Sequence, residues 1–119
     1  MNARQAAWFM RAFGDATRLR VVAALSNREL SVGQLARLLR SPKARLSRHL
    51  RYLHARGVVE AEPVANSVVY RLAPPQHPLH QWVLEAVQQC AGDVTEMIRD
   101  AERLPTVAKG GDSRGKSVG

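Results

Sequence analysis

The sequence predicts a mainly α-helical domain that contains one small β-hairpin. Two patterns support this fold class. Apolar residues recur at helical spacing in the first half of the chain and again near its end, and two short Val-rich segments of alternating polarity lie between these regions. With 119 residues, the chain has the length of one domain with a modest core. We therefore expect five helices and a hairpin in one domain over residues 1–104.

Capping residues delimit four helices before the hairpin. Asp15 is a good N-cap for the second helix, and Ser31 is a good N-cap for the third. Ser41 followed by Pro42 is typical of an N-cap and a first helical residue, and Gly57 ends the fourth helix. The four predicted helices cover residues 3–13, 16–25, 32–40 and 42–56.

The spacing of apolar residues changes from helical to alternating after the fourth helix. Val residues dominate two short segments, and Ala65 and Asn66 separate them, which indicates a hairpin. The two strands are expected over residues 58–64 and 67–72.

A long last helix is predicted over residues 79–104. Its apolar residues recur in steps of four and three, the spacing of a helix packed lengthwise on another helix. They are Val83, Val87, Cys90, Val94, Met97, Ala101 and Leu104. Gly92 lies inside this helix and can bend or break it. Residues 105–119 have little to bury, so we expect a disordered basic tail.

Charge is distributed unevenly along the chain. Lys and Arg outnumber Asp and Glu by nine in residues 1–76, whereas the net charge is −3 in residues 77–104 and +2 in residues 105–119. This separation predicts one surface for a polyanion and another for a different partner. No apolar run is long enough to span a membrane, and the single Cys90 fits a reducing compartment, so we expect a cytoplasmic protein without membrane association.

The fourth predicted helix combines an apolar stripe with a dense positive charge. Residues 40–57 contain six Lys or Arg and no Asp or Glu, yet Leu46, Leu50 and Leu53 recur at helical spacing. At about 100° per residue the leucines share one face and the arginines face away from it. Such a helix fits the DNA major groove, where Arg pairs with guanine.

Four segments of the chain together resemble the ArsR/SmtB family of bacterial transcriptional repressors. They are "FGDATRLRVVAAL" from Phe13, "ELSVGQLARLL" from Glu29, "LSRHLRYLHARGVV" from Leu46 and "VVYRL" from Val68. The resemblance implies a winged helix-turn-helix that forms a homodimer through its first and last helices. It also implies binding to a palindromic operator in double-stranded DNA and release by an inducer.

The resemblance also implies roles for individual residues. Base contacts are expected from Lys43, Arg45, Ser47, Arg48 and His49, and phosphate contacts from Ser41, Arg51 and Tyr52. The dimer interface is expected to contain Phe9, Met10, Phe13, Val83, Val87, Cys90, Val94 and Met97. His49 lies about 60° from the leucine stripe, so it either contacts a base or is wedged against the third helix.

Three positions depart from the family pattern. Ala65 and Asn66 occupy the wing tip, where relatives usually have Gly-Arg, so the contribution of the wing to DNA binding is open. Arg71 either contacts a phosphate in its place or has a structural role. Arg40 stands where many relatives have Gly in the turn before the fourth helix.

The metal sites of the family are incomplete in this chain. Ser31 and Gly33 occupy the positions of the paired cysteines of relatives that sense thiophilic metals. The zinc-ligand offsets along the last helix fall on His80, Trp82, Asp93 and Glu96, and Trp82 cannot ligate a metal. We expect no metal and no cofactor, and we expect His77 and His80 to begin the last helix as exposed or capping residues.

Cys90 has two interpretations. A free cysteine on an apolar seam is usually a small buried residue. Near a two-fold axis, however, two copies could be linked by an oxidant or a soft metal, which would make Cys90 a thiol sensor.

The predicted function is sequence-specific DNA binding by a homodimeric repressor of a bacterial operon. The alternative is a winged-helix module that has lost specific DNA reading and binds proteins through its acidic last helix. An enzyme is not expected, because Cys90 lies ten or more residues from His77 and His80 and the chain has no Gly-rich phosphate loop.

Overall fold

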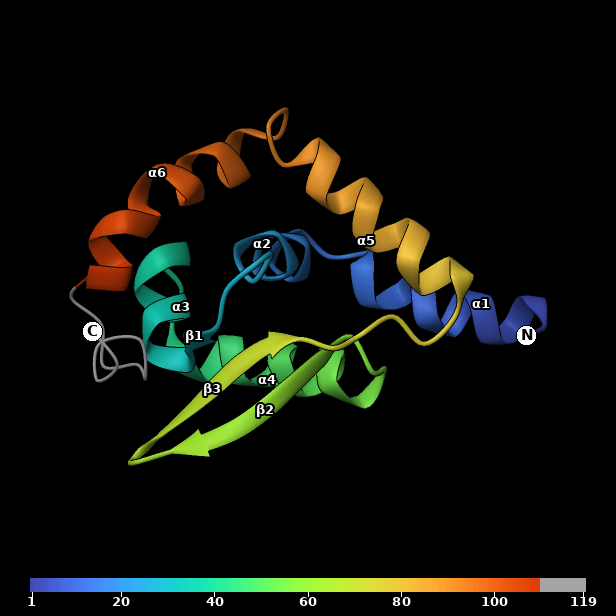
Figure 1. Cartoon of the computed structure of the whole chain (residues 1–119), viewed down its shortest axis with the longest axis horizontal. Coiled ribbons are helices and arrows are strands. Elements are labelled where there is room, and N and C mark those ends of the chain that lie inside the picture. Colours follow the sequence, from blue (N-terminus) through green and yellow to red (C-terminus); the bar gives the residue numbers. More distant parts are fainter. Residues whose placement is uncertain (110–119) are drawn as a thin grey trace.

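The computed structural model describes residues 1–109 and has the predicted fold class, a mainly α-helical domain with one small sheet (Figure 1). Its elements in chain order are α1 (Ala3–Met10), the short 3₁₀ helix η1 (Arg11–Phe13), α2 (Ala16–Ala24), β1 (Leu30–Ser31), α3 (Val32–Leu39), α4 (Lys43–Ala55), β2 (Val59–Val64), β3 (Ser67–Leu72), α5 (Pro78–Cys90) and α6 (Thr95–Lys109). α5 and α6 form an arch over α2, and the β2–β3 hairpin lies on the opposite side, beside α4 (Figure 1). Within the described residues, no helix is long and apolar enough to cross a membrane.

The N-termini of α2 and α3 are capped as predicted. The side chains of Asp15 and Ser31 each accept a hydrogen bond from the backbone N–H three residues further on. The start of α4 differs from the prediction, because its N-cap is Pro42, which has no capping side chain, and the helix begins at Lys43. The N–H of Ser41 instead donates to a carbonyl oxygen of α3 at 3.1 Å, so Ser41 belongs to the end of α3.

The sheet has three antiparallel strands in the order β1-β3-β2. The register places Val64 opposite Ser67, so Ala65 and Asn66 form the predicted two-residue turn. Ala65 has a φ of 54°, a left-handed conformation that costs a residue with a Cβ about 1 kcal/mol or more. β1 was not predicted from the sequence, because two residues are too few to show an alternating pattern.

The prediction of one continuous helix over residues 79–104 is wrong. α5 ends at Cys90 and α6 begins at Thr95, and a turn that contains Gly92 lies between them. In this turn the N–H of Asp93 donates to the carbonyl oxygen of Cys90 at 2.9 Å. The break allows α5 to pack on α2 while α6 packs on both α2 and α3. The domain therefore has six α-helices in its described part, where five were predicted.

α6 also extends further than predicted. Pro105 lies inside the helix, which continues to Lys109 although a proline removes one helical hydrogen bond. Residues 105–109, which the sequence analysis assigned to a disordered tail, are therefore helical. Residues 110–119, the rest of the predicted tail, lie outside the described residues.

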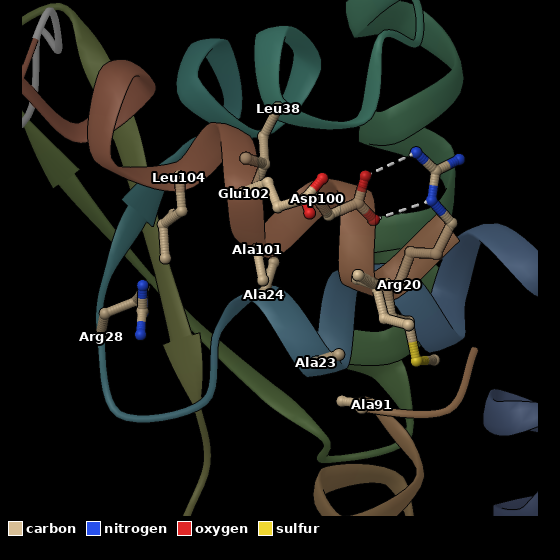
Figure 2. Close-up of a pocket in the computed structure, with 13 residues that line it drawn as sticks. Arg20, Ala23, Ala24, Arg28, Leu38, Ala91, Asp100, Ala101, Glu102 and Leu104 are labelled. Carbon is tan, nitrogen blue, oxygen red and sulfur yellow. Dashed lines mark hydrogen bonds and ion pairs between the residues drawn. The ribbon is translucent and has the colours of Figure 1, made fainter. Parts of the chain in front are cut away.

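A buried ionic cluster fastens α6 to the end of α3. Arg20 donates from Nε and Nη2 to the two carboxylate oxygens of Asp100, both at 2.9 Å, and Arg103 Nη2 donates to Oδ1 at 2.6 Å (Figure 2 shows the Arg20 contacts). The same arginines donate to the last carbonyls of α3: Arg20 to Leu39 at 3.0 Å and Arg103 to Leu38 at 2.8 Å. The hydrogen bonds that Arg20 donates to the carboxylate of Asp100 raise the pKa of Arg20.

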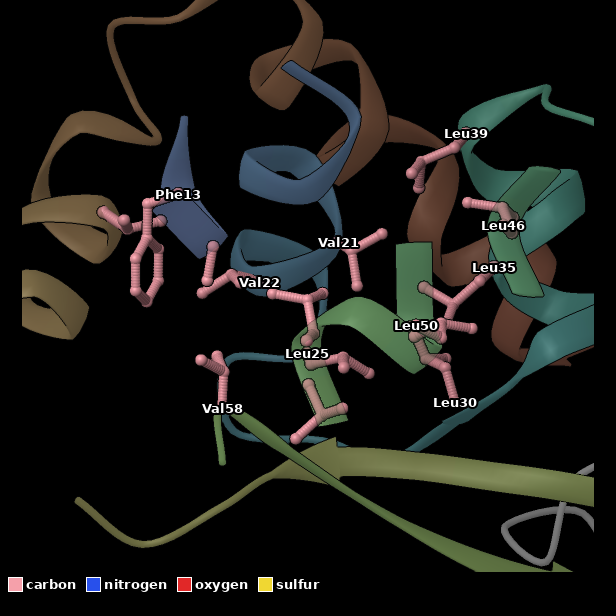
Figure 3. Packing of buried hydrophobic residues seen from close by; sticks show 14 of the residues in the cluster. Phe13, Val21, Val22, Leu25, Leu30, Leu35, Leu39, Leu46, Leu50 and Val58 are labelled. Carbon is pink, nitrogen blue, oxygen red and sulfur yellow. The ribbon is translucent and has the colours of Figure 1, made fainter. Parts of the chain in front are cut away.

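The core lies between the helices and the sheet, and α3 and α4 supply three buried residues each, more than any other element of the described chain (Figure 3). Leu46, Leu50 and Leu53 of α4 have no exposed side-chain surface, as their spacing predicted. Burying a side chain of this size contributes about 1.5–3 kcal/mol, so these three residues hold α4 firmly against the domain. Other buried residues of the core are Val21, Val22, Leu25, Leu30, Leu35, Leu38, Leu39 and Val58.

Candidate nucleic-acid interface

The outer face of α4 carries the positive charge that the sequence predicted. Because the leucine face is buried, the opposite face of the helix must point to solvent. Ala44, Arg48, Arg51 and Ala55 lie on that side and are exposed. Arg45 on its flank and Lys43 in the first turn are also exposed. Together with the buried leucines, they make α4 a helix with one anchored side and one cationic side.

The cations of this face have no carboxylate partner in residues 1–109. No ion pair of the described chain involves Lys43, Arg45, Arg48 or Arg51. The first turn of α4 contains no acidic residue, so Lys43 and Arg45 lie at the positive end of the helix dipole without compensation. A bound anion such as a phosphate would relieve this repulsion.

His49 and Ser47 lie at the edge of the cationic face, and both are partly buried. His49 Nδ1 lies 3.3 Å from Nη1 of Arg18 and 3.8 Å from Oδ2 of Asp15. His49 is therefore packed against the N-terminus of α2, and its imidazole does not project freely toward a groove. Partial burial alone would raise the pKa of Asp15, but the hydrogen bond from the backbone of Arg18 and the charges of His49 and Arg18 outweigh it and lower the pKa.

Tyr52 is held between two arginines. The guanidinium carbons of Arg18 and Arg56 lie 4.1 and 3.6 Å from the centre of its ring. Arg56 also lies 4.8 Å from the ring centre of Trp8 and donates from Nε to the Trp8 carbonyl oxygen at 3.0 Å. This stack connects α4 to α1 and α2. Sequence analysis missed Arg18 and Arg56; the only local signal was the spacing of four between Tyr52 and Arg56.

The turn between α3 and α4 contains Arg40, which stands where many relatives have Gly. Arg40 has φ 52° and ψ 50°, the left-handed conformation that glycine adopts without strain. Ser41 follows, and its Oγ is buried without a hydrogen-bond partner in the described chain, so it does not project toward a phosphate. Arg40 itself is exposed next to the start of α4 and adds to the cationic surface.

The wing, which consists of β2, β3 and their turn, has no free cation. Its only Lys or Arg is Arg71, which donates to Glu60 at 3.0 Å and to Glu62 at 3.1 Å and lies 3.6 Å from Glu29. The hydrogen bonds that Arg71 donates to the carboxylates of Glu62 and Glu60 raise the pKa of Arg71. Of the two roles considered for Arg71, the structure supports the structural one.

Comparison with known proteins identifies the family. The sequence model for bacterial regulatory proteins of the arsR family matches residues 15–61, which include α2, α3 and α4. The HTH-type transcriptional regulator KmtR of Mycobacterium tuberculosis is 32% identical over 112 residues, which cover 92% of this chain and 83% of KmtR. The chain belongs to the ArsR family. The HTH-type transcriptional repressor SmtB of M. tuberculosis is 36% identical over 84 residues, and the match spans 71% of this chain and only 61% of SmtB.

Solved structures agree with the ArsR assignment. HlyU from Vibrio cholerae has a TM-score of 0.65 at 28% identity, covering 74% of this chain and 92% of HlyU. The transcriptional repressor BigR from Xylella fastidiosa has a TM-score of 0.64 at 26% identity, covering 77% of this chain and 90% of BigR. The predicted winged helix-turn-helix is thereby confirmed.

The residues that the family resemblance placed at the dimer interface differ in burial in this ArsR chain, and all but one are at least half-buried. Phe9, Phe13, Val87 and Met97 are buried in the core of the single chain. Val83, Cys90 and Val94 are half-buried and pack against the same core. Only Met10 is exposed, at 44%. The seam along α5 and α6 therefore faces the chain's own core, because the break at residues 91–94 turns both helices onto it.

Met10 shares the exposed apolar surface of α1 and α5 with two tryptophans that were not predicted at the interface. Trp8 is 43% exposed and Trp82 is 64% exposed, and Met10 lies on the same helix as Trp8. Exposed aromatic side chains of this size are typical of an interaction surface. From the sequence, Trp82 was recognisable only as a residue that cannot ligate a metal.

Cys90 matches its simpler interpretation within the single chain. Its side chain is half-buried against the core, and its Sγ lies 3.3 Å from the carbonyl oxygen of Val87, to which it donates. No group of three or more His, Cys, Asp or Glu side chains in residues 1–109 is arranged to hold a metal ion.

His77 and His80 begin α5, and one of them differs from the prediction. His77 is the N-cap and accepts the N–H of His80 at 3.1 Å, so its capping role is confirmed. His80 is only 1% exposed, with its ring 5.0 Å from that of Phe9 and its Nδ1 accepting the N–H of Gln76 at 3.1 Å. Burial, with a smaller contribution from the charge of His77, lowers the pKa of His80.

Proposed function

We propose that the protein is a homodimeric DNA-binding transcriptional regulator that places α4 in the major groove of an operator. The observation that carries this proposal is the outer face of α4, where four exposed cations have no carboxylate partner in the described chain. Relatives named as transcriptional repressors, such as SmtB and BigR, favour repression as the mode of action. Such a protein acts in the bacterial cytoplasm.

Residues near the start of α4 read the bases in this proposal. Lys43, Arg45 and Arg48 reach base edges, because the N-terminal end of a reading helix enters the groove. Each bidentate pair of Arg with guanine discriminates by about 1–3 kcal/mol. Arg51 contacts a phosphate. His49 and Tyr52, which were expected to touch DNA, position α4 through their contacts with Arg18.

The dimer in this proposal uses the exposed apolar residues of α1 and α5. Trp8, Met10 and Trp82 form the apolar surface that a second copy would cover. The two copies of α4 would then meet successive major grooves about 34–36 Å apart, which requires a palindromic operator. Because Arg71, the only Lys or Arg of the wing, is paired with glutamates, most phosphate contacts come from α4 and the turn before it.

Fluorescence anisotropy with labelled DNA tests the proposal. The probe is the region upstream of the host gene, with a scrambled duplex of equal length for comparison. We expect Arg45→Ala and Arg48→Ala to weaken binding to the upstream region by about 5- to 150-fold, which corresponds to about 1–3 kcal/mol. Arg51→Ala should weaken binding to both duplexes, and log K should fall steeply with log salt, by about 0.9 per phosphate contact.

Arg99→Ala is the matched control, because Arg99 is an exposed arginine of α6, away from α4. Its binding should equal that of the wild type. Equal losses in Arg45→Ala and Arg99→Ala would refute the role of α4. Equal affinity of the wild type for the upstream and scrambled duplexes would favour the alternative, a winged-helix module that binds proteins.

A further inference from the structure

A pocket of about 560 Å³ lies between α2, α3 and α6, and none of its lining residues belongs to α4 (Figure 2). Small side chains form much of its wall: Ala24 from α2, Ala91 and Gly92 from the turn after α5, and Ala101 from α6. Larger apolar residues, among them Leu104, and four charged residues, Arg20, Arg28, Asp100 and Glu102, complete the lining. A volume in this range and a mainly apolar lining are typical of sites for small organic molecules.

We propose that this pocket binds an uncharged, apolar organic molecule and that its occupation weakens DNA binding by α4. The effect on DNA rests on the proposed function. The polar groups of the pocket favour an uncharged ligand. Arg20 and Asp100 at one end are hydrogen-bonded to each other, and Arg28 at the other end donates to the carbonyl oxygen of Ser26. Arg28 and Glu102, the other charged residues of the lining, are exposed to water, so no buried charge of the lining needs an ion from the ligand.

A second copy of the chain is a weaker candidate for this pocket. Ile98, which is 39% exposed, is the only exposed large apolar residue of the pocket in the described chain, whereas Trp8, Met10 and Trp82 lie on α1 and α5. In Figure 1, α1 lies at the end of the molecule opposite α6. A partner chain thus has its own apolar surface elsewhere, and the pocket remains open to solvent.

The pocket is directly connected to the end of α3. Leu38 lines it with its side chain, while the Leu38 carbonyl oxygen accepts a hydrogen bond from Arg103 at 2.8 Å. Asp100, another lining residue, holds both Arg103 and Arg20, and Arg20 donates to the Leu39 carbonyl oxygen. These two carbonyls are the last of α3.

Only the strained turn at Arg40 separates these carbonyls from α4, which begins at Lys43. A molecule inserted between α2 and α6 would move α6 away from α3 and loosen the bonds that hold the end of α3. The tilt of α4 relative to the domain would then change. A ligand that binds the conformation with the tilted α4 more tightly than the DNA-binding conformation lowers the affinity for DNA. At saturation, the decrease equals the ratio of the ligand's affinities for the two conformations.

The first experiment measures binding of N-phenyl-1-naphthylamine, an uncharged apolar fluorophore, to the full chain without DNA. We expect saturable binding that Ala101→Leu weakens at least tenfold, because Ala101 is an exposed helical residue whose enlargement fills the pocket without entering the core. Thr106→Leu is the control, since Thr106 is exposed on the same helix and does not line the pocket. It should bind the fluorophore as the wild type does.

Light scattering of the same variants separates a ligand pocket from a contact between copies. The molar mass of Ala101→Leu should equal that of the wild type. A lower mass would show that a second copy occupies the pocket and would overturn the proposal. The absence of saturable binding, or equal binding by the wild type and Ala101→Leu, would also overturn it, and neither result bears on DNA binding.

The second experiment repeats the anisotropy measurement with the fluorophore at saturation. Affinity of the wild type for the upstream duplex should fall at least fivefold, while that of Ala101→Leu should not change. Unchanged wild-type affinity would refute the link to α4. If the wild type bound no DNA in either condition, the proposed function and the link would both fail, and the binding site would be judged by the first experiment alone.

Discussion

Asp100→Asn provides the most direct test of how α6 is held in place. Asp100 is 4% exposed, and three charge-assisted hydrogen bonds end on its carboxylate at 2.6–2.9 Å. The amide of asparagine keeps the size of the side chain but replaces one acceptor oxygen by an NH₂ group. That group would face the donors of Arg20 or Arg103, so at least one arginine would lose its partner.

The expected loss of stability follows from burial. Removing one partner of a buried ion pair costs about 3–5 kcal/mol, because the remaining charge is left without compensation. The side chains of Arg20 and Arg103 are 20% and 24% exposed, so water offsets part of this cost. We expect a loss of about 2–4 kcal/mol in the free energy of unfolding and a decrease of roughly 10–20 °C in Tm.

Urea unfolding followed by circular dichroism at pH 7 measures this loss. Glu102→Gln is the matched control, because Glu102 is an exposed carboxylate on the same helix and lies outside every ion pair of the described chain. Its free energy of unfolding should stay within about 0.5 kcal/mol of the wild type. If Asp100→Asn cost no more than this control, the argument that the cluster holds α6 on α3 would be wrong.

Three further predictions follow from single residues. Arg40→Gly should be about 1 kcal/mol more stable than Arg40→Ala in urea unfolding, since only glycine adopts the left-handed turn without strain; equal stabilities would contradict this. Burial lowers the folded-state pKa of His80 below its unfolded value near 6.5, so the unfolded state takes up the proton first and stability should decrease as pH falls below about 6.5, by at most about 1.4 kcal/mol per pH unit. The slope of that decrease should be smaller in His80→Gln and unchanged in His54→Gln, an exposed control. Cys90→Ser should bind DNA as the wild type does and should abolish any release caused by the thiol oxidant diamide, and release of the variant by diamide would exclude Cys90 as a sensor.

The candidate interface was predictable because its signal is local. The spacing of Leu46, Leu50 and Leu53 determines which side of α4 is buried, and this places the arginines on the other side whatever the leucines contact. Asp15 and Ser31 were recognisable as caps for the same reason, since each acts on a backbone N–H three residues away. Ser41 was wrongly assigned as the N-cap of α4, because its backbone N–H donates to the carbonyl oxygen of Ala36 and so belongs to the C-terminal turn of α3.

The role of a polar residue could not be predicted when its partner is distant in the sequence. Asp100 binds Arg20, which is 80 residues away, and His49 contacts Arg18, which is 31 residues away. Arg71 was left with two roles because two of its glutamates lie on the neighbouring strand β2 and the third lies in the segment before β1. Charge alone does not show whether an arginine meets a carboxylate of its own chain or remains available for DNA.

By itself, the sequence determined the helices before the hairpin, the hairpin and the cationic side of α4, because short-range periodicity and capping specify them. Only the tertiary structure decided where α5 ends, which cations are paired, and that the apolar seam of α5 and α6 faces the chain's own core while Trp8 and Trp82 remain exposed. An apolar seam shows that a helix must be covered on one side. What covers it depends on the direction in which the chain turns at residues 91–94, and contacts with distant helices set that direction.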